Sequence, residues 1–193
     1  MQSQLPKHRR EAHGVFSVRL YDESRCGSIV TQALHVDEWQ PARVGGDGRP
    51  SVDAALRAAW HANPSRLKAI HNDFEKRVLQ VVRPVLRQVW GCDFERCEGT
   101  HLVRYRRGGH FVPHKDADED HYAFRYFTVL CYLNNNFKGG KTSFESLGYC
   151  ATPIPGKALI FPSRFVHCGE SVLSGEKFVL VTWLCGPAPV HWM

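Results

Sequence analysis

Apolar residues recur every third or fourth position over the longest regular stretch of the chain. The stretch runs from Asn63-Pro64 to Gly91 and predicts one amphipathic helix. Asparagine followed by proline suits the start of a helix, and glycine suits its end. Pro84 lies inside the pattern and removes a backbone donor, so we expect it to kink or divide the helix. The apolar stripe consists of Leu67, Ile70, Phe74, Val78, Val81, Val85 and Val89.

Shorter patterns precede this helix. Residues 1–13 are polar and basic, which predicts a loose tail. The other predicted elements are a strand over Val15–Tyr21, a helix from a Ser24 cap to Leu34, an extended segment over 35–40, and a helix over Asp53–His61 capped by Ser51. Residues 41–50 are rich in glycine and proline, and we expect them to form a loop. That loop is either a surface connection or a lid over a substrate.

The second half of the chain has the alternation and the turn residues of a sheet. The predicted strands are Thr100–Arg106, Phe111–His114, Arg125–Asn134, Lys141–Glu145, Ala158–Pro162 and Phe178–Cys185. Helices in the first half and strands in the second argue for the α+β class, with helices packed on one face of a largely antiparallel sheet sandwich. The 193 residues suffice for a single domain with a sizeable core.

Composition narrows the function classes. The net charge is +6, but lysine and arginine are scattered, so the sequence disfavours nucleic acid as the partner. No apolar run is long enough to span a bilayer. The seven cysteines include no CxxC pair, and the N-terminus has no apolar signal stretch, so we expect reduced thiols and a cytoplasmic protein. The sequence leaves the oligomeric state open.

One short motif stands out as candidate chemistry. In an extended segment His114 and Asp116 project to the same side, so both side chains can reach one metal ion. His167, at the end of a further short strand pattern, is the best candidate for a third ligand. Two imidazoles and one carboxylate form the facial set of non-haem Fe(II) oxygenases. Lys177 follows at the start of an apolar strand, where a buried cation needs a carboxylate partner.

Six blocks in a fixed order extend this motif. They are 105–116 (YRRGGHFVPHKD), 125–134 (RYFTVLCYLN), 139–144 (GGKTSF), 155–161 (PGKALIF), 167–172 (HCGESV) and 175–177 (GEK). Together they resemble the prolyl 4-hydroxylase branch of the Fe(II)/2-oxoglutarate-dependent dioxygenases. The resemblance implies a double-stranded β-helix, or jelly roll, over 99–186, supported by the strands and helices of 14–98.

The same resemblance implies roles for individual residues. His114, Asp116 and His167 would be the catalytic iron ligands, and Lys177 would pair with the distal carboxylate of 2-oxoglutarate. The cosubstrate pocket would also include Tyr105, Tyr132, Thr128 and Thr142, and Trp183 matches an aromatic residue on the last core strand. The implied cofactors are Fe(II), 2-oxoglutarate and O2, with ascorbate as a further candidate.

The implied activity is hydroxylation of an aliphatic carbon in an amino acid, or in a residue of a peptide or protein, with release of succinate and CO2. Asp116 stands where related halogenases have a small residue, which favours hydroxylation. Two alternatives stay open. One is an oxidative demethylase acting on nucleic acid, and the other is a binding or sensing module of the same fold without catalysis.

Overall fold

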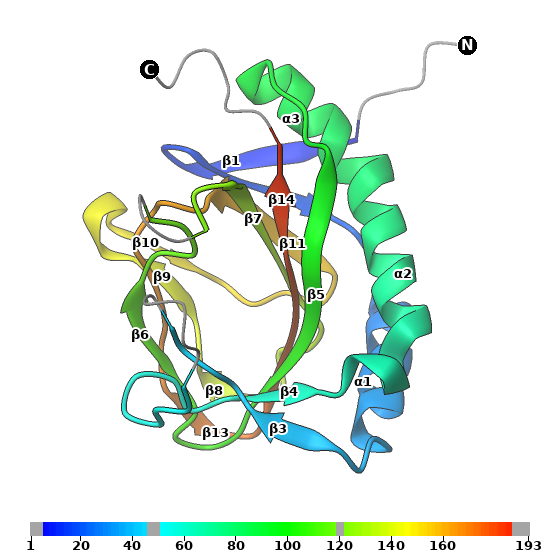
Figure 1. The fold of residues 1–193 in the computed structure, drawn as a ribbon, viewed down its shortest axis with the longest axis vertical. Coiled ribbons are helices and arrows are strands. Elements are labelled where there is room, and N and C mark those ends of the chain that lie inside the picture. Colours follow the sequence, from blue (N-terminus) through cyan, green and yellow to red (C-terminus); the bar gives the residue numbers. More distant parts are fainter. Residues whose placement is uncertain (1–5, 46–50, 119–121, 187–193) are drawn as a thin grey trace.

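Two facing sheets with helices on one outer side make up the architecture of this computed structural model (Figure 1). The structure describes residues 6–45, 51–118 and 122–186. Within them the large sheet has the strand order β1 (His8–Ala12), β2 (Val15–Arg19), β11 (Lys157–Pro162), β7 (Arg125–Tyr132), β14 (Lys177–Cys185), β5 (Arg96–Tyr105), β4 (Trp60–Ala62) and β3 (Trp39–Pro41).

The small sheet faces the large one across the core, and its strands have only three or four residues. Its order is β10 (Tyr149–Ala151), β9 (Thr142–Phe144), β12 (His167–Gly169) and β6 (Phe111–His114), and β8 (Lys138–Gly139) pairs with β13 (Val172–Ser174) nearby. Every pairing among these named strands is antiparallel. The arrangement confirms the α+β class and the jelly-roll core.

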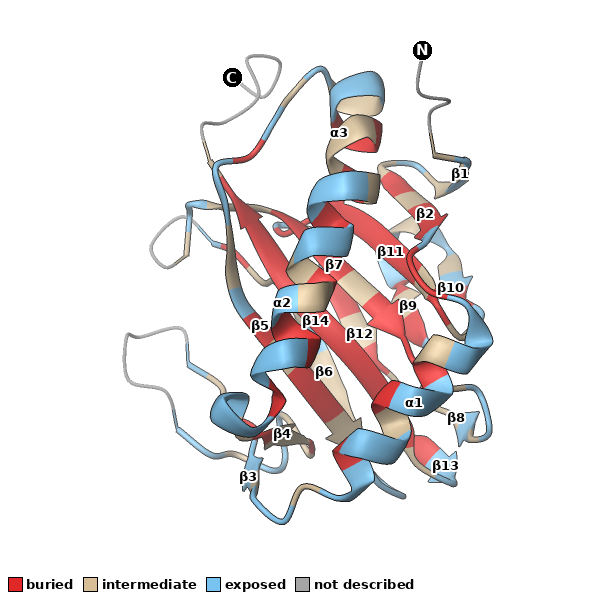
Figure 2. Cartoon of the chain, turned by 90° about the vertical axis from the view of Figure 1, so that its right-hand side faces the viewer, coloured by how far each residue is buried: buried red, intermediate tan, exposed pale blue. Residues whose placement is uncertain are grey.

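The helices pack on the outer face of the large sheet, with their exposed sides turned to solvent (Figure 2). They are α1 (Glu23–Leu34), the 3-10 turn η1 (Pro64–Leu67), α2 (Lys68–Arg77), the π turn η2 (Val78–Val82) and α3 (Arg83–Trp90), and a short 3-10 turn, η3 (Glu145–Leu147), follows β9. Among the described residues, no helix combines the length and the apolar character needed to cross a membrane.

Pro84 divides the long helix as predicted. The π turn of η2 lies directly before it and rearranges the backbone hydrogen bonds where proline lacks a donor. The apolar stripe nevertheless stays continuous, because Phe74, Val78 and Val85 are all completely buried. Gly91 ends the helix in the left-handed conformation, with φ of 64°.

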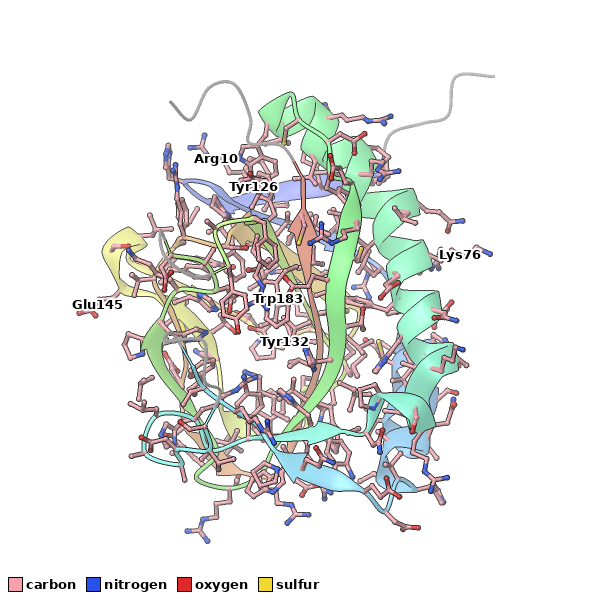
Figure 3. All side chains as sticks on the ribbon, viewed as in Figure 1. Arg10, Lys76, Tyr126, Tyr132, Glu145 and Trp183 are labelled. Atoms are coloured by element: carbon pink, nitrogen blue, oxygen red, sulfur yellow. The ribbon has the colours of Figure 1, made fainter. Side chains whose placement is uncertain are left out.

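The hydrophobic core has two parts. One lies between the helices and the large sheet and includes Ile29, Phe74, Leu86 and Leu180. The other lies between the two sheets and includes Phe144, Phe161 and the side chains that surround the candidate site. Figure 3 shows Tyr132 and Trp183 in this interior, whereas Lys76 points away from the outer side of α2.

Several sequence predictions were wrong in detail. The tail of 1–13 is not loose over His8–Ala12, which pairs with β2 as an edge strand. Residues 53–61 form a turn, a bridge and the start of β4 instead of a helix, because Arg57 pairs with Phe111 of β6 and Trp60 and His61 pair with β5. The cap of α1 is Asp22, whose carboxylate accepts from the backbone N–H of Arg25 at 2.7 Å, and not Ser24. The strands β8, β10 and β13 were not predicted, since each is only two or three residues long.

Candidate active site

The two predicted histidines are neighbours across a strand pairing. His114 ends β6 and His167 begins β12, and the two residues face each other in the antiparallel register. Paired residues of antiparallel strands project to the same face, and here the ring centroids are 4.3 Å apart. His167 therefore starts its strand, whereas the sequence pattern placed it at a strand end. The register of the small sheet brings the two imidazoles together.

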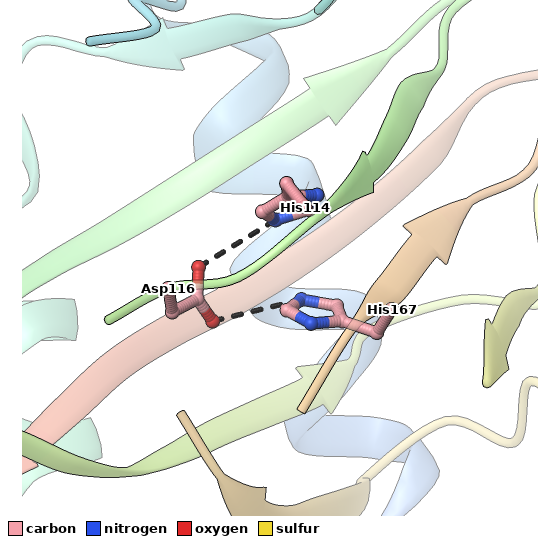
Figure 4. Close-up of side chains that lie close together, drawn as sticks. All are labelled: His114, Asp116 and His167. Carbon is pink, nitrogen blue, oxygen red and sulfur yellow. Dashed lines mark ion pairs between the residues drawn. The ribbon is translucent and has the colours of Figure 1, made fainter. Parts of the chain in front are cut away.

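Asp116 reaches the same point from a bend beyond β6, and not from the strand itself. Its backbone N–H donates to the carbonyl oxygen of Ser163 at 2.9 Å, which fixes the bend. The carboxylate oxygens lie 3.6 Å from Nε2 of His114 and 3.6 Å from Nε2 of His167 (Figure 4). The hydroxyl of Thr128 on β7 donates to the same carboxylate at 2.7 Å. The sequence analysis placed both side chains on one side of a single extended segment. His114 and Asp116 do lie together, but Asp116 is positioned by the bend and not by the alternation of a strand.

The hydrogen bonds of the two rings set which nitrogen faces the carboxylate. Nδ1 of His114 lies 2.8 Å from the carbonyl oxygen of Val112, and Nδ1 of His167 lies 3.1 Å from that of Phe165. A carbonyl oxygen only accepts, so Nδ1 carries the proton and the Nε2 lone pair points inward. Orientation of this kind is typical of metal-ligating histidines.

The protonation states agree with this geometry. Burial lowers the pKa of His167 to about 4, so its ring is neutral near pH 7. Burial by itself raises the pKa of the Asp116 carboxyl, but His167, His114 and the Thr128 hydroxyl outweigh it and hold the pKa well below the usual value. The cluster therefore presents the carboxylate of Asp116 and a neutral ring at His167.

This donor set fits a divalent cation. The three ligand atoms lie within 4.8 Å of one another. Lone pairs that converge without a proton between them repel each other, and a cation in their midst removes that repulsion. Two imidazoles and one carboxylate on one side of a metal leave its other positions open, which is the set preferred by Fe(II) oxygenases.

Lys177 lies in the same hollow as the cluster. It begins β14, is only 2% exposed, and faces Tyr105 of β5 in the strand register. Its Nζ donates to the carbonyl oxygen of Gly140 at 2.7 Å and lies 4.9 Å from the centre of the Tyr105 ring. Burial lowers the pKa of Lys177 to about 8.

The remaining predicted residues occupy different positions. Tyr105, Thr128 and Thr142 line the hollow together with Lys177. Tyr132 is completely buried and is absent from the lining; its hydroxyl donates to Thr142 at 2.7 Å. Tyr132 therefore stands behind Thr142 and acts on the hollow through it.

Sequence reasoning missed several residues around the cluster. Phe111 stacks on His114 with ring centroids 3.4 Å apart. Arg57, from the segment wrongly predicted as a helix, lines both this inner hollow and a wider outer hollow of about 770 Å³. Arg125 lies on the outer hollow against Trp183. Arg125 begins one of the six blocks that resemble the family, so the sequence offered a signal for it. Arg57 lies outside all six blocks, so the sequence offered none.

The loop of 41–50 is only partly described. Residues 46–50 lie outside the described residues, while Pro41, Arg43, Val44 and Gly45 line the outer hollow. Val44 and Ser51 form an isolated antiparallel bridge across the loop. The lid function stays a prediction.

Comparison with known proteins gives a match over the part of the chain that contains this cluster. The model of the 2OG-Fe(II) oxygenase superfamily matches residues 100–185. A protein of Acanthamoeba polyphaga mimivirus named as a prolyl 4-hydroxylase is 29% identical over 126 residues, which cover 53% of this chain and 52% of that protein. The prolyl 4-hydroxylase subunit alpha-1 of Bos taurus is 26% identical over 196 residues, which cover 81% of this chain and 37% of the subunit. The chain thus matches about half the length of the first relative and much less of the second.

Solved structures share the fold. A prolyl hydroxylase from Trichoplax adhaerens, in complex with a hypoxia inducible factor peptide fragment, has a TM-score of 0.73 and 18% identity over 89% of this chain and 83% of that one. A prolyl-4-hydroxylase from Pseudomonas putida has a TM-score of 0.67 and 18% identity over 91% of this chain and 94% of its own.

These findings converge on one family. A match to this family implies Fe(II), 2-oxoglutarate and O2 as cofactor and cosubstrates. The cluster of two histidines and one aspartate is a ligand set that suits Fe(II). Residues 100–185 match the model of the 2OG-Fe(II) oxygenase superfamily, and the sequence relatives, the jelly-roll fold and this cluster support an oxygenase of prolyl hydroxylase type.

Proposed function

We propose that this protein is a dioxygenase that uses Fe(II) and 2-oxoglutarate to hydroxylate an aliphatic carbon of an amino acid, or of a residue in a peptide or protein. The reaction consumes O2 and releases succinate and CO2. The observation that carries the proposal is the convergence of His114, Asp116 and His167 in one hollow with the buried Lys177. The metal and cosubstrate supply oxidising power toward an unactivated C–H bond.

In this proposal the chain's own residues hold and orient the reacting groups. Nε2 of both histidines and a carboxylate oxygen of Asp116 hold Fe(II). The Thr128 hydroxyl fixes the carboxylate, and the backbone carbonyls of Val112 and Phe165 fix the rings. The inner hollow also has apolar walls that exclude water from the metal, formed by Val103, Leu130, Val179 and Val181.

Lys177 is the anchor for the distal carboxylate of 2-oxoglutarate. An ammonium group has three donors, and among the described residues Nζ has one hydrogen-bond acceptor, the carbonyl oxygen of Gly140. A buried cation without a counter-ion is costly, and a carboxylate removes that cost. Tyr105 and Thr142 add hydroxyl groups to the same hollow, and Tyr132 orients Thr142.

The relatives support the proposed substrate class. They include prolyl hydroxylases, and one is solved with a bound peptide. We therefore favour an amino acid or a peptide or protein residue over the nucleic acid of a demethylase. The complete ligand set favours an enzyme over a silent binding module. The seven unpaired cysteines support the proposal of a reducing, cytoplasmic environment.

Anaerobic addition of Fe(II) and 2-oxoglutarate tests the site directly. The expected result is a weak charge-transfer band in the visible range that is lost in His167→Ala and retained in His13→Ala, a control at an exposed turn. Absence of the band, or its survival in His167→Ala, contradicts the metal assignment. Succinate formation across free amino acids, proline-containing peptides and basic peptides then identifies the substrate class.

A further inference from the structure

Arg57 is a guanidinium in the wall between the inner and the outer hollow, and none of the described carboxylates pairs with it. Nη1 donates to the carbonyl oxygen of Arg43 at 3.2 Å, and Nη2 lies 3.0 Å from Nε2 of His61. Its buried Nε has no hydrogen-bond partner in the part of the chain that the structure describes. Arginine stays charged in proteins, so the wall holds a positive charge that forms no salt bridge with the described carboxylates.

The second guanidinium of the outer hollow differs in this respect. Arg125 donates to Glu98 through Nε at 2.6 Å and through Nη2 at 3.0 Å, a bidentate pair that neutralises its charge. It also stacks on Trp183 at 3.9 Å. Of the two, Arg57 alone keeps donors and charge for a ligand.

The neighbours of Arg57 leave that charge in place. His61 and His101, whose rings lie tilted with centroids 4.7 Å apart, are kept neutral because burial lowers the pKa of His61 to about 2 and that of His101 to about 4. Asp116 belongs to the metal cluster, and Asp118 lies at the exposed rim of the outer hollow. Trp183 adds a second buried donor without a partner, its Nε1, on the same two hollows.

The position of Arg57 links it to the reacting centre. Its Cζ lies 4.6 Å from the centre of the Phe111 ring, and Phe111 stacks on His114. The guanidinium is therefore one aromatic ring away from a metal ligand. Lys177, in contrast, lies on the inner hollow and not on the outer one. The two cations can thus hold two different anions.

We propose that Arg57 binds a carboxylate of the substrate, so that the oxidised carbon belongs to a molecule with a free carboxylate close by. Three sources share this chemistry: a free amino acid, the C-terminal residue of a peptide, and an acidic side chain. The planar guanidinium matches a carboxylate through two parallel N–H donors. This inference rests on the proposed function, because it assigns the outer hollow to the substrate of that reaction.

A binding measurement without turnover tests the inference. In protein labelled with 15N-arginine and loaded with Zn²⁺ and 2-oxoglutarate, acetate is titrated while the Nε–H signals of the arginines are followed by NMR. Arg57→Lys identifies the Arg57 signal by its loss. We expect that signal to shift saturably with acetate and to stay unchanged with acetamide, while the Arg125 signal, already paired with Glu98, hardly moves.

Two outcomes of this titration overturn the inference. The first is an Arg57 signal that ignores acetate or responds equally to acetamide. The second is an Arg57 signal that already shifts to saturation with 2-oxoglutarate alone and then blocks acetate, since Arg57 would then belong to the cosubstrate site. Both are separate from the proposed function, which fails when the Fe(II) charge-transfer band is absent.

Turnover separates the three carboxylate sources. Succinate formation is measured with free amino acids, with peptides ending in a carboxylate, and with C-terminally amidated peptides containing an acidic residue, each paired with a version in which that carboxylate is an amide. In the active pair we expect the acid to be preferred over the amide. The KM of the acid should rise at least about tenfold in Arg57→Gln. In Arg57→Lys, which keeps the positive charge, the rise in KM should be smaller. Arg66→Gln, an exposed arginine paired with Glu38, is the charge-matched control. Equal use of acid and amide, or an unchanged KM in Arg57→Gln, contradicts the inference.

Discussion

The large and the small sheet of this jelly roll make different contributions. In the large sheet all nine residues of β14 are buried, and the helices cover its outer face. In the small sheet the strands have three or four residues, yet β6 and β12 supply both histidines of the candidate site. Long paired strands under helices bury the most apolar area and supply most of the stability. The short sheet can therefore place polar ligands at an open end of the core, since stability depends on it less.

Removing an aromatic side chain under the large sheet should give the largest change in folding free energy. Phe74 on α2 is completely buried. Phe74→Ala is expected to lower the free energy of unfolding by about 3–5 kcal/mol, measured by urea denaturation, while the folded variant keeps its Fe(II) and 2-oxoglutarate band. Leu79→Ala, at a side chain 41% exposed, is the control. Equal stability of the two variants would contradict the inference that packing of the helices on the large sheet supplies most of the stability.

Substitution at the candidate site should lower Fe(II) affinity strongly and the free energy of unfolding only slightly. Asp116→Asn keeps the size of the side chain but removes its charge, so Fe(II) affinity is expected to fall by more than the roughly 10–100-fold that the loss of an outer partner costs. Urea denaturation of the metal-free protein should change much less than in Phe74→Ala. Asp37→Asn, at an exposed position, controls for net charge. A large loss of stability with intact Fe(II) binding would refute the division of roles.

Thr128 is a residue of the large sheet that contacts the candidate site, since its hydroxyl hydrogen-bonds to Asp116 beyond β6 of the small sheet. Thr128→Val removes the hydroxyl that donates to Asp116 at 2.7 Å and lies 3.0 Å from the Ser163 hydroxyl. We expect Fe(II) affinity or turnover to fall about 10–100-fold. Thr182→Val is the matched variant, because Thr182 is equally buried on β14 but donates to the carbonyl oxygen of Glu98. If both variants bind Fe(II) alike, the Thr128 hydroxyl does not orient the carboxylate.

The pH dependence of stability is expected to involve two partly buried histidines of the large sheet. Burial lowers the pKa of His61 to about 2 and that of His101 to about 4, both below the unfolded value near 6.5. Above about pH 6.5 neither state binds these protons; below it the unfolded state binds them and the native state does not, so stability falls as pH drops from about 6.5 toward 4. The urea midpoint should follow this trend.

Replacement of both rings isolates their share of the acid sensitivity. A His61→Gln, His101→Gln double variant is expected to show a shallower loss of stability over the same pH range, while other groups continue to contribute. An identical pH profile in the wild type and the double variant would show that these histidines are not the cause.

The sequence by itself determined the α+β class, the long divided helix, most strands longer than three residues, and the three residues of the candidate metal cluster. Periodic apolar positions and ordered motifs are properties of the sequence itself, so they can be recognised without knowledge of the tertiary contacts. Asn63 accepts from the N–H of Ser65 at 3.1 Å at the start of η1, and Gly91 ends α3, as their residue types predicted.

Only the tertiary structure decided how distant segments meet. The register of β6 against β12 sets His114 opposite His167, and the backbone of Ser163 fixes the bend of Asp116. Residues 53–61 follow a helical pattern, but Arg57 forms a bridge to Phe111 of β6, and Trp60 and His61 pair with β5, because tertiary contacts override weak local propensity. That pairing leaves Arg57 in the wall of the two hollows, without a counter-ion among the described residues. No local pattern encodes such a position, since its chemistry depends on which charges the fold brings near it.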